Sequence, residues 1–202
     1  MVFTRCLLLF LVVSLLGHAG SAECAVSLPR MRPYTGIGLV VFLNSGSTTR
    51  QDLQLQLYEE PGLVRAGVLN SPWTSGNEWI FGPLDGSVPL IVSSQKGGWL
   101  RVFYDDAGRE AWIDPENKGQ FQSWEQYLKL QTGRMLPGLQ QQYYQFLQQP
   151  NGRTLALLTP KQVFKVLKLE SDWGMVLTDQ SQIGWIRWRD TDGRLTIGTG
   201  KK

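Results

Sequence analysis

Four acidic residues come nearest to a catalytic grouping in this sequence: Asp105, Asp106, Asp114 and Glu116. Two carboxyl groups about 5 to 10 Å apart across a substrate cleft can hydrolyse a glycosidic bond. Aspartate is also typical of solvated turns, where its side chain hydrogen-bonds to the backbone. We therefore expect a turn here and a protein that is not an enzyme, with a carboxylate enzyme as the alternative.

Histidine and cysteine, on which nucleophilic and metal chemistry depend, are scarce. The one histidine, His18, and one of the two cysteines, Cys6, lie in a segment that we expect to be cleaved off. Without histidine, Cys-His catalysis, Ser-His-Asp catalysis and His-containing zinc sites are excluded. The remaining Cys24 has no intramolecular partner, so it is free, paired with another chain or modified. We expect no catalytic residue, no metal and no cofactor.

Residues 1–22 have the organisation of a secretory signal peptide. Arg5 gives a positive start, residues 6–17 are apolar, and residues 20–22 are the small residues of a cleavage site. The apolar run is shorter than the roughly 20 residues that cross a bilayer as a helix. We expect an exported protein, periplasmic or secreted, with no membrane span after signal removal.

The charge balance excludes one large class of partner. The chain has 20 Lys and Arg against 17 Asp and Glu, for a formal net charge of +3. Loss of Arg5 with the signal peptide lowers this by one. Nucleic-acid recognition needs a basic patch or stripe and a much larger excess. We expect no nucleic-acid partner.

Aromatic residues recur at similar spacings in two parts of the chain, which predicts a repeated domain. Residues 97–113 hold two strand-like apolar runs around a polar turn. Residues 172–186 repeat this hairpin pattern, and the paired tryptophans are thirteen and twelve residues apart. Upstream, residues 56–62 resemble residues 145–152. We infer two copies of one small domain.

The segments around these hairpins have local patterns of their own. Residues 36–43 form an apolar run, for which we expect an edge strand added to the first copy. Residues 52–58 alternate, with leucines on one face and Tyr58 on the other. Residues 121–130 have apolar side chains three to four apart and a capping serine, which predicts a helix. Residues 140–149 align with the first strand of copy one and are predicted as a strand, with a helix as the rival.

These patterns divide the chain into consecutive parts. We expect a signal peptide (1–22) and then an N-terminal extension with an added strand (23–50). A first copy (51–117) with an insertion (71–85) follows. A helical connector (118–141) leads to a second copy (142–197) and a tail (198–202).

The repeated motifs resemble the Src-homology-three family. Asp172-Trp173, a short hairpin and Gly184-Trp185-Ile186 are similar to the latter half of such a domain. Leu57-Tyr58 and the following Glu-Glu-Pro are similar to its opening strand and acidic loop. Export and tandem copies point to the bacterial branch. The resemblance implies a mainly β fold, with two small Src-homology-three-like antiparallel β-barrels in tandem and one short connecting helix.

The same resemblance implies where ligands bind. Trp99 and Trp173 match the tryptophan on the family's ligand face, and Tyr58 matches the aromatic of its opening motif. Burial in the core is the alternative for the two tryptophans. Trp112 and Trp185 are expected to pack inside. In peptide-binding members of the family, a Pro and a Tyr follow the strand that corresponds to the one carrying Trp112 or Trp185. Neither copy keeps both residues, so the resemblance does not imply proline-rich ligands.

The insertion holds Trp73 and Trp79 among Gly, Pro, Ser and Asn. Rigid aromatics in a turn-rich loop are typical of binding loops. The alternative is a loop folded over the barrel as a lid on its core. Copy one is the favoured binder, because copy two lacks the insertion and has Gly174 where copy one has Leu100.

The expected function is binding without catalysis. The sequence predicts an exported protein of the bacterial cell envelope, which recognises cell-wall peptide or glycan through aromatic-lined barrel grooves. Two copies would raise avidity if both engage at once. The alternative is a protein-protein adaptor or scaffold in the periplasm, because aromatic patches serve both kinds of partner.

Overall fold

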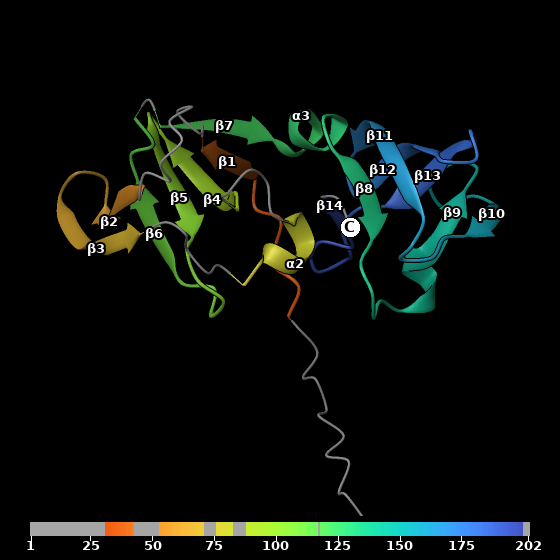
Figure 1. Ribbon diagram of the computed structural model, residues 1–202, viewed down its shortest axis with the longest axis horizontal. Helices are drawn as coiled ribbons and strands as arrows, with labels where there is room; N and C mark the ends of the chain where they lie inside the picture. The colour runs from red at the N-terminus through yellow and green to blue at the C-terminus, as the bar shows by residue number, and fades with distance from the viewer. Residues whose placement is uncertain (1–30, 43–52, 71–75, 83–87, 117, 200–202) are drawn as a thin grey trace, which may run out of the picture. The chain divides into compact units, whose positions relative to one another are not determined.

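The structure is a computed structural model that describes residues 31–42, 53–70, 76–82, 88–116 and 118–199. The expected signal peptide, Cys24 and Trp73 lie outside these residues. Within them, the chain forms two antiparallel sheets and a few short helices (Figure 1). The prediction of a mainly β protein is confirmed.

The first sheet is built from the residues of the expected extension, the first copy and the start of the expected connector. Its strands pair antiparallel in the order β3-β2-β6-β5-β4-β1-β7. The strands are β1 (Gly38–Phe42), β2 (Gln54–Glu60), β3 (Val64–Asn70), β4 (Leu90–Lys96), β5 (Trp99–Phe103), β6 (Glu110–Ile113) and β7 (Gly119–Ser123).

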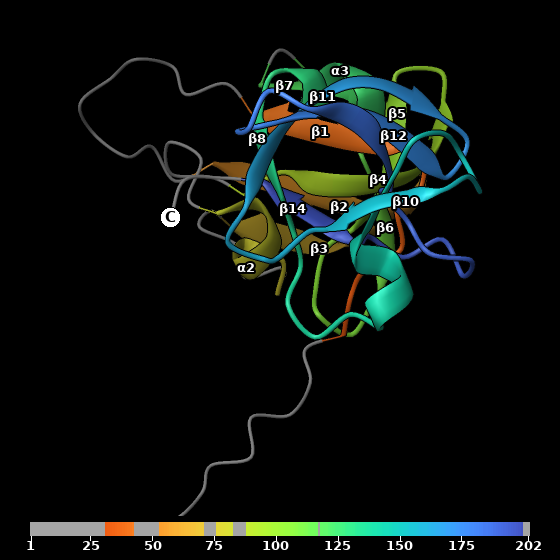
Figure 2. The ribbon, with the colours of Figure 1, turned by 90° about the vertical axis from the view of Figure 1, so that its right-hand side faces the viewer.

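The second sheet repeats this order seven strands later, as β10-β9-β13-β12-β11-β8-β14. Its strands β8, β10, β11, β12 and β14 are labelled in Figure 2. Its strands are β8 (Thr132–Met135), β9 (Gln145–Leu147), β10 (Thr154–Leu157), β11 (Val163–Glu170), β12 (Trp173–Thr178), β13 (Ile183–Arg187) and β14 (Ile197–Thr199). In each sheet, no pairing between described residues joins the first strand of this order to the last.

Two of the expected strand assignments need correction. β1 is not an edge strand, because it pairs with both β4 and β7. Its run of buried residues shows that the two faces of the strand are largely covered as well. Residues 140–149 begin with a single turn of 3-10 helix, η1 (Gln141–Tyr144), and within them only Gln145–Leu147 form the expected strand, β9. The expected connector contains strands β7 and β8 as well as a helix.

That helix, α3 (Trp124–Lys129), begins as the sequence predicts. The Ser123 side chain accepts a hydrogen bond from the backbone N–H of Gln126, and the Gln126 side chain accepts one from the Ser123 N–H. This capping box satisfies two of the donors that a helix leaves free at its start. No helix in the described part of the chain is long and apolar enough to cross a membrane.

The alternation predicted for residues 52–58 is confirmed on β2. Leu55 and Leu57 are buried, whereas Gln54 is exposed and Tyr58 is half-buried on the other face. The two leucines belong to a hydrophobic cluster inside the first sheet, together with Leu100 and other residues of β1, β4, β5 and β6. Tyr58 is therefore directed away from this core.

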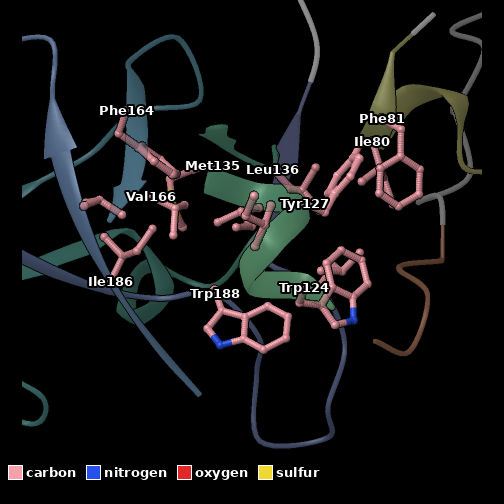
Figure 3. Packing of buried hydrophobic residues seen from close by; sticks show 14 of the residues in the cluster. Ile80, Phe81, Trp124, Tyr127, Met135, Leu136, Phe164, Val166, Ile186 and Trp188 are labelled. Carbon is pink, nitrogen blue, oxygen red and sulfur yellow. The ribbon is translucent and has the colours of Figure 1, made fainter. Parts of the chain in front are cut away.

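A second hydrophobic cluster combines residues of both sheets with two helices, α3 and α2 (Glu78–Phe81) (Figure 3). Phe81 stacks on Trp124 with ring centroids 6.3 Å apart and meets Tyr127 edge-on at 6.1 Å. Trp124 lies 5.6 Å from Trp188 and donates its indole N–H to the Thr35 carbonyl at 2.6 Å. The described part of the expected insertion is thus built into a core.

Residues 31–37, the N-terminal strap, run along the end of the second sheet before the chain enters the first. The guanidinium of Arg32 donates to Asp190 at 2.6 Å and to the Leu195 carbonyl at 2.9 Å. In return, the Leu195 N–H donates to the Pro33 carbonyl at 3.1 Å. The strap therefore ties the start of the first sheet to the second.

Tyr127 gives the fold a predictable sensitivity to alkali. Burial raises the pKa of Tyr127 to about 12, and the hydrogen bond of its hydroxyl with Thr199, at 3.0 Å, lowers the pKa by less. The unfolded chain ionises this phenol near pH 10, so Tyr127 contributes a stability that is complete below pH 10 and is lost as the pH rises to about 12.

We expect the free energy of unfolding, measured in urea at a series of pH values across this window, to fall more steeply for the native chain than for Tyr127→Phe. The phenylalanine keeps the buried ring and cannot ionise. An equal slope for both proteins would contradict this assignment.

Candidate functional site

Trp173 and Arg187 form the centre of a pocket on the second sheet. They lie directly opposite each other on β12 and β13. Side chains at such a pair point to the same face of the sheet. The Cζ atom of Arg187 lies 4.4 Å from the centroid of the Trp173 ring, a cation–π contact. Strand pairing therefore fixes an aromatic face and a positive charge side by side.

The pocket around them has a volume of about 330 Å³. This lies at the lower end of the range of small-molecule sites, roughly 300 to 1,000 Å³. Most of the lining comes from η1, from β9 and the turn that follows it, and from the two central strands. The lining residues are Gln142, Tyr143, Gln145, Leu147, Asn151, Gly152, Trp173, Arg187 and Thr191.

The turn between β9 and β10 contributes Asn151 and Gly152 to this lining. The turn is held by hydrogen bonds from the Gln148 N–H to the Arg153 carbonyl and from the Gly152 N–H to the Gln149 carbonyl, both at 2.9 Å. Asn151 has a φ of 57°, in the left-handed region that Asn tolerates better than most residues. An amide side chain is thereby placed at the pocket.

Two of the acidic groups next in sequence to the pocket residues, Asp172 and Asp190, are paired with other arginines, whereas Asp192 is exposed. Asp172 accepts a hydrogen bond from Arg189 Nε at 2.6 Å, and Asp190 pairs with Arg32. Burial raises the pKa of Asp190, but hydrogen bonds from the Arg194 backbone and the Arg32 side chain outweigh it and hold the pKa below its ordinary value. Among the described residues that line the pocket, Arg187 alone carries a charge.

The first sheet brings Tyr58 and Trp99 together at the corresponding place. Their ring centroids are 5.1 Å apart and their planes meet at 83°, an edge-to-face contact. Gly62, in the turn after β2, lies against the Trp99 ring, which an added Cβ would meet at 3.4 Å. Both aromatic rings are half-buried. Two of the predicted site residues thus share one surface, and Trp173 lies on the other sheet.

Strand register aligns the two sites residue by residue. Tyr58 pairs with Trp112 as Leu147 pairs with Trp185, so Leu147 takes the place of Tyr58. By the same alignment, Asn151 takes the place of Gly62. Arg187 takes the place of Asp114, which directly follows the end of β6.

Trp79 lies apart from both aromatic surfaces. It belongs to α2 and packs, half-buried, against the cluster that contains Phe81. Its carbonyl accepts a hydrogen bond from Arg134 at 3.2 Å, and its buried indole nitrogen has no hydrogen-bond partner among the described residues. This position corresponds to the core lid, the alternative to a binding loop. Trp73 lies outside the described residues.

The acidic group that starts with Asp105 forms hydrogen-bonded turns. Asp105 accepts hydrogen bonds from the backbone and the side chain of Arg109. Burial raises the pKa of Asp105, but these bonds outweigh it and lower the pKa below its ordinary value. A general acid needs a raised pKa instead. Asp114 likewise accepts a bond from the Glu116 N–H at 3.0 Å, as an aspartate in a turn does.

Several pocket residues escaped the predictions from sequence, chiefly Arg187, Asn151 and Tyr143. The motifs of the repeat drew attention to aromatic residues that both copies share. The signal that could have found Arg187 is a difference between the copies, because the residue after the last hairpin strand is Asp114 in one and Arg187 in the other.

Comparison with known proteins gives distant structural similarity alone. No family model matches the sequence, and no curated protein matches it. The structure of NlpC1 from Trichomonas vaginalis is 11% identical, with a TM-score of 0.34 over 84% of this chain and 52% of that chain. The endolysin LysPBC5 CBD is 14% identical, with a TM-score of 0.25 over 83% of this chain and 98% of that one. The chain thus spans about half the length of NlpC1.

Proposed function

We propose that this chain is a non-catalytic binding protein of the bacterial cell envelope, which recognises cell-wall peptide or glycan. The observation that carries the proposal is Trp173, which lies half-buried in the wall of a pocket of about 330 Å³. In ligand sites, a few placed polar or charged groups beside an aromatic surface fix the orientation of the ligand. The signal peptide expected at residues 1–22 supports a partner outside the cytoplasm.

In this proposal each sheet is a small Src-homology-three-like barrel, and the two barrels are tandem copies. The identical strand order of the two sheets supports this assignment. So does the hairpin of β2 and β3, which lies where the family has its long acidic loop, with β9 and β10 as its counterpart. The aromatic surface at Tyr58 and Trp99 is then a second groove, equivalent in position to the pocket.

The positions of the two tryptophans favour a ligand groove over the adaptor alternative. An adaptor or scaffold in which the two copies pack face to face would bury these side chains between them. Among the described residues, neither Trp99 nor Trp173 belongs to the buried clusters, and both are half-buried. The part of each tryptophan that stays exposed is available to an external ligand.

Co-sedimentation with purified cell-wall sacculi tests the proposal. We expect the chain without residues 1–22 to pellet with sacculi. Trp173→Ala should lose at least about tenfold in affinity, since truncating a tryptophan at the centre of a binding site costs about 2 kcal/mol or more and a factor of ten requires about 1.4 kcal/mol. Trp99→Ala reports on the first groove in the same assay.

Ile183→Ala is the matched control. Ile183 lies on the same strand as Arg187 but is 59% exposed, so its truncation removes apolar surface without touching the pocket. All variants are first compared with the native chain by thermal unfolding. Native protein that stays in the supernatant, or a folded Trp173→Ala variant that pellets as the native chain does, would refute wall binding through this pocket.

A further inference from the structure

The guanidinium of Arg187 is presented for a planar acceptor. It lies over the Trp173 ring, with Cζ 4.4 Å from the ring centroid. Stacking on an aromatic face engages the flat side of a guanidinium and leaves the N–H groups at its edge able to donate. Two parallel N–H bonds from such an edge match the two oxygens of a carboxylate.

These donors have no hydrogen-bond or ion-pair partner among the described residues. The side chain of Arg187 is unpaired there, whereas the side chain of Arg189 is bound to Asp172 and that of Arg32 to Asp190. None of the described residues that line the pocket is acidic. A charged side chain on a pocket wall, without a protein counter-ion, is suited to a ligand of opposite charge.

The rest of the lining is polar but neutral, with a small apolar part. Gln142, Gln145, Asn151 and Thr191 offer hydrogen-bonding groups without charge, and Leu147 offers an apolar surface. From this arrangement we propose that the pocket of the second sheet binds a carboxylate-bearing ligand, with Arg187 holding the carboxylate and Trp173 covering the adjoining group. The inference rests on the proposed function and names the chemistry of its ligand.

The equivalent surface of the first sheet carries the opposite charge. Asp114 stands where the second sheet has Arg187, and Glu59 and Glu60 are exposed at the end of β2. In the second sheet, glutamines 148 and 149 stand in place of these two glutamates. Repulsion between like charges disfavours a carboxylate beside Tyr58 and Trp99. The two copies therefore differ in ligand preference, and the carboxylate site belongs to the second.

Nuclear magnetic resonance of the chain without residues 1–22 provides the test. The indole N–H signal of Trp173, assigned by its loss in Trp173→Phe, is followed during titration with two acids and their neutral counterparts. Acetyl-alanyl-alanine is compared with its C-terminal amide, and N-acetylmuramic acid with N-acetylglucosamine. The first pair represents a peptide carboxylate and the second a sugar carboxylate.

We expect at least one acid to shift the Trp173 signal and both neutral counterparts to fail. Arg187→Gln should weaken the effective acid by about 10-fold to 100-fold, as loss of a charge-assisted bond does. Lys165→Gln removes the same charge from an exposed position on β11 and should bind as the native chain does. The acid that acts identifies a peptide or a sugar as the source of the carboxylate.

Three results would overturn the inference: no shift with either acid, equal shifts with the neutral counterparts, or unchanged acid binding in folded Arg187→Gln. Sacculus binding separates this failure from that of the proposed function. If Arg187→Gln pellets as the native chain does, the carboxylate site is wrong and wall binding stands. If acids shift the Trp173 signal but the native chain does not pellet, the site stands and the wall is not its partner.

Discussion

Phe81→Ala will lower the free energy of unfolding by about 3 to 5 kcal/mol, the range observed when a buried phenylalanine is truncated. Phe81 is 1% exposed and lies against Trp124 and Tyr127. Its removal leaves a cavity between helices α2 and α3, because the rings around it come from elements held in place by other contacts. Equilibrium unfolding in urea measures the change.

This result distinguishes the two roles predicted for the insertion at 71–85. A binding loop would tolerate the substitution, whereas a segment built into the core would not. Leu63→Ala is the control, because Leu63 is 82% exposed and should change the free energy of unfolding by less than about 0.5 kcal/mol. A loss of less than about 1 kcal/mol in Phe81→Ala would show that α2 is not part of the core.

The second large effect is expected at Asp190, where the N-terminal strap meets the second sheet. The carboxylate of Asp190 is 4% exposed and accepts bonds from Arg32 at 2.6 Å, from the Arg194 N–H at 2.8 Å and from the Asp192 N–H at 3.0 Å. Asp190→Ala leaves these donors without an acceptor and should cost about 3 to 5 kcal/mol, as breaking a buried ion pair does.

The pH dependence of stability provides an independent check on Asp190. Since the pKa of Asp190 is held below its usual 3.8 in the folded chain, its contribution is complete above that value and is lost as the pH falls through the folded pKa. Asp190→Asn removes the charge but keeps the shape, so its stability should depend less on pH in this acidic range. An Asp190→Asn variant with the native acid dependence would contradict the assignment.

The sequence predicted those parts of the fold in which side-chain periodicity is strong. The alternation of Leu55 and Leu57 on β2 and the capping box of α3 are both local patterns, and both are confirmed. β7 escaped because its sequence, Gly119 to Ser123, is mostly polar, and β8 because it has four residues. Such strands are specified by pairing with distant segments rather than by their own composition.

The sequence indicated only part of the candidate site, because motifs show which aromatic residues recur but not which residues the fold brings beside them. Tyr58 and Trp99 were expected on one surface, and the structure places them in contact at 5.1 Å. Phe81 lies among Gly and Pro residues, where composition indicates a loop, but tertiary packing buries it in a core. The role proposed for Arg187 depends on its position over Trp173. That position is set by the register of β12 and β13.

Binding of soluble cell-wall fragments, mapped by backbone and indole chemical shifts, tests the central claim most directly. Fragments released from sacculi by a muramidase carry both peptide and glycan in one soluble ligand. We expect saturable shifts concentrated at Trp173, Arg187 and Asn151, which line one pocket. Saturable binding whose shifts leave these three residues unmoved, or no shifts in the presence of excess fragments, would contradict it.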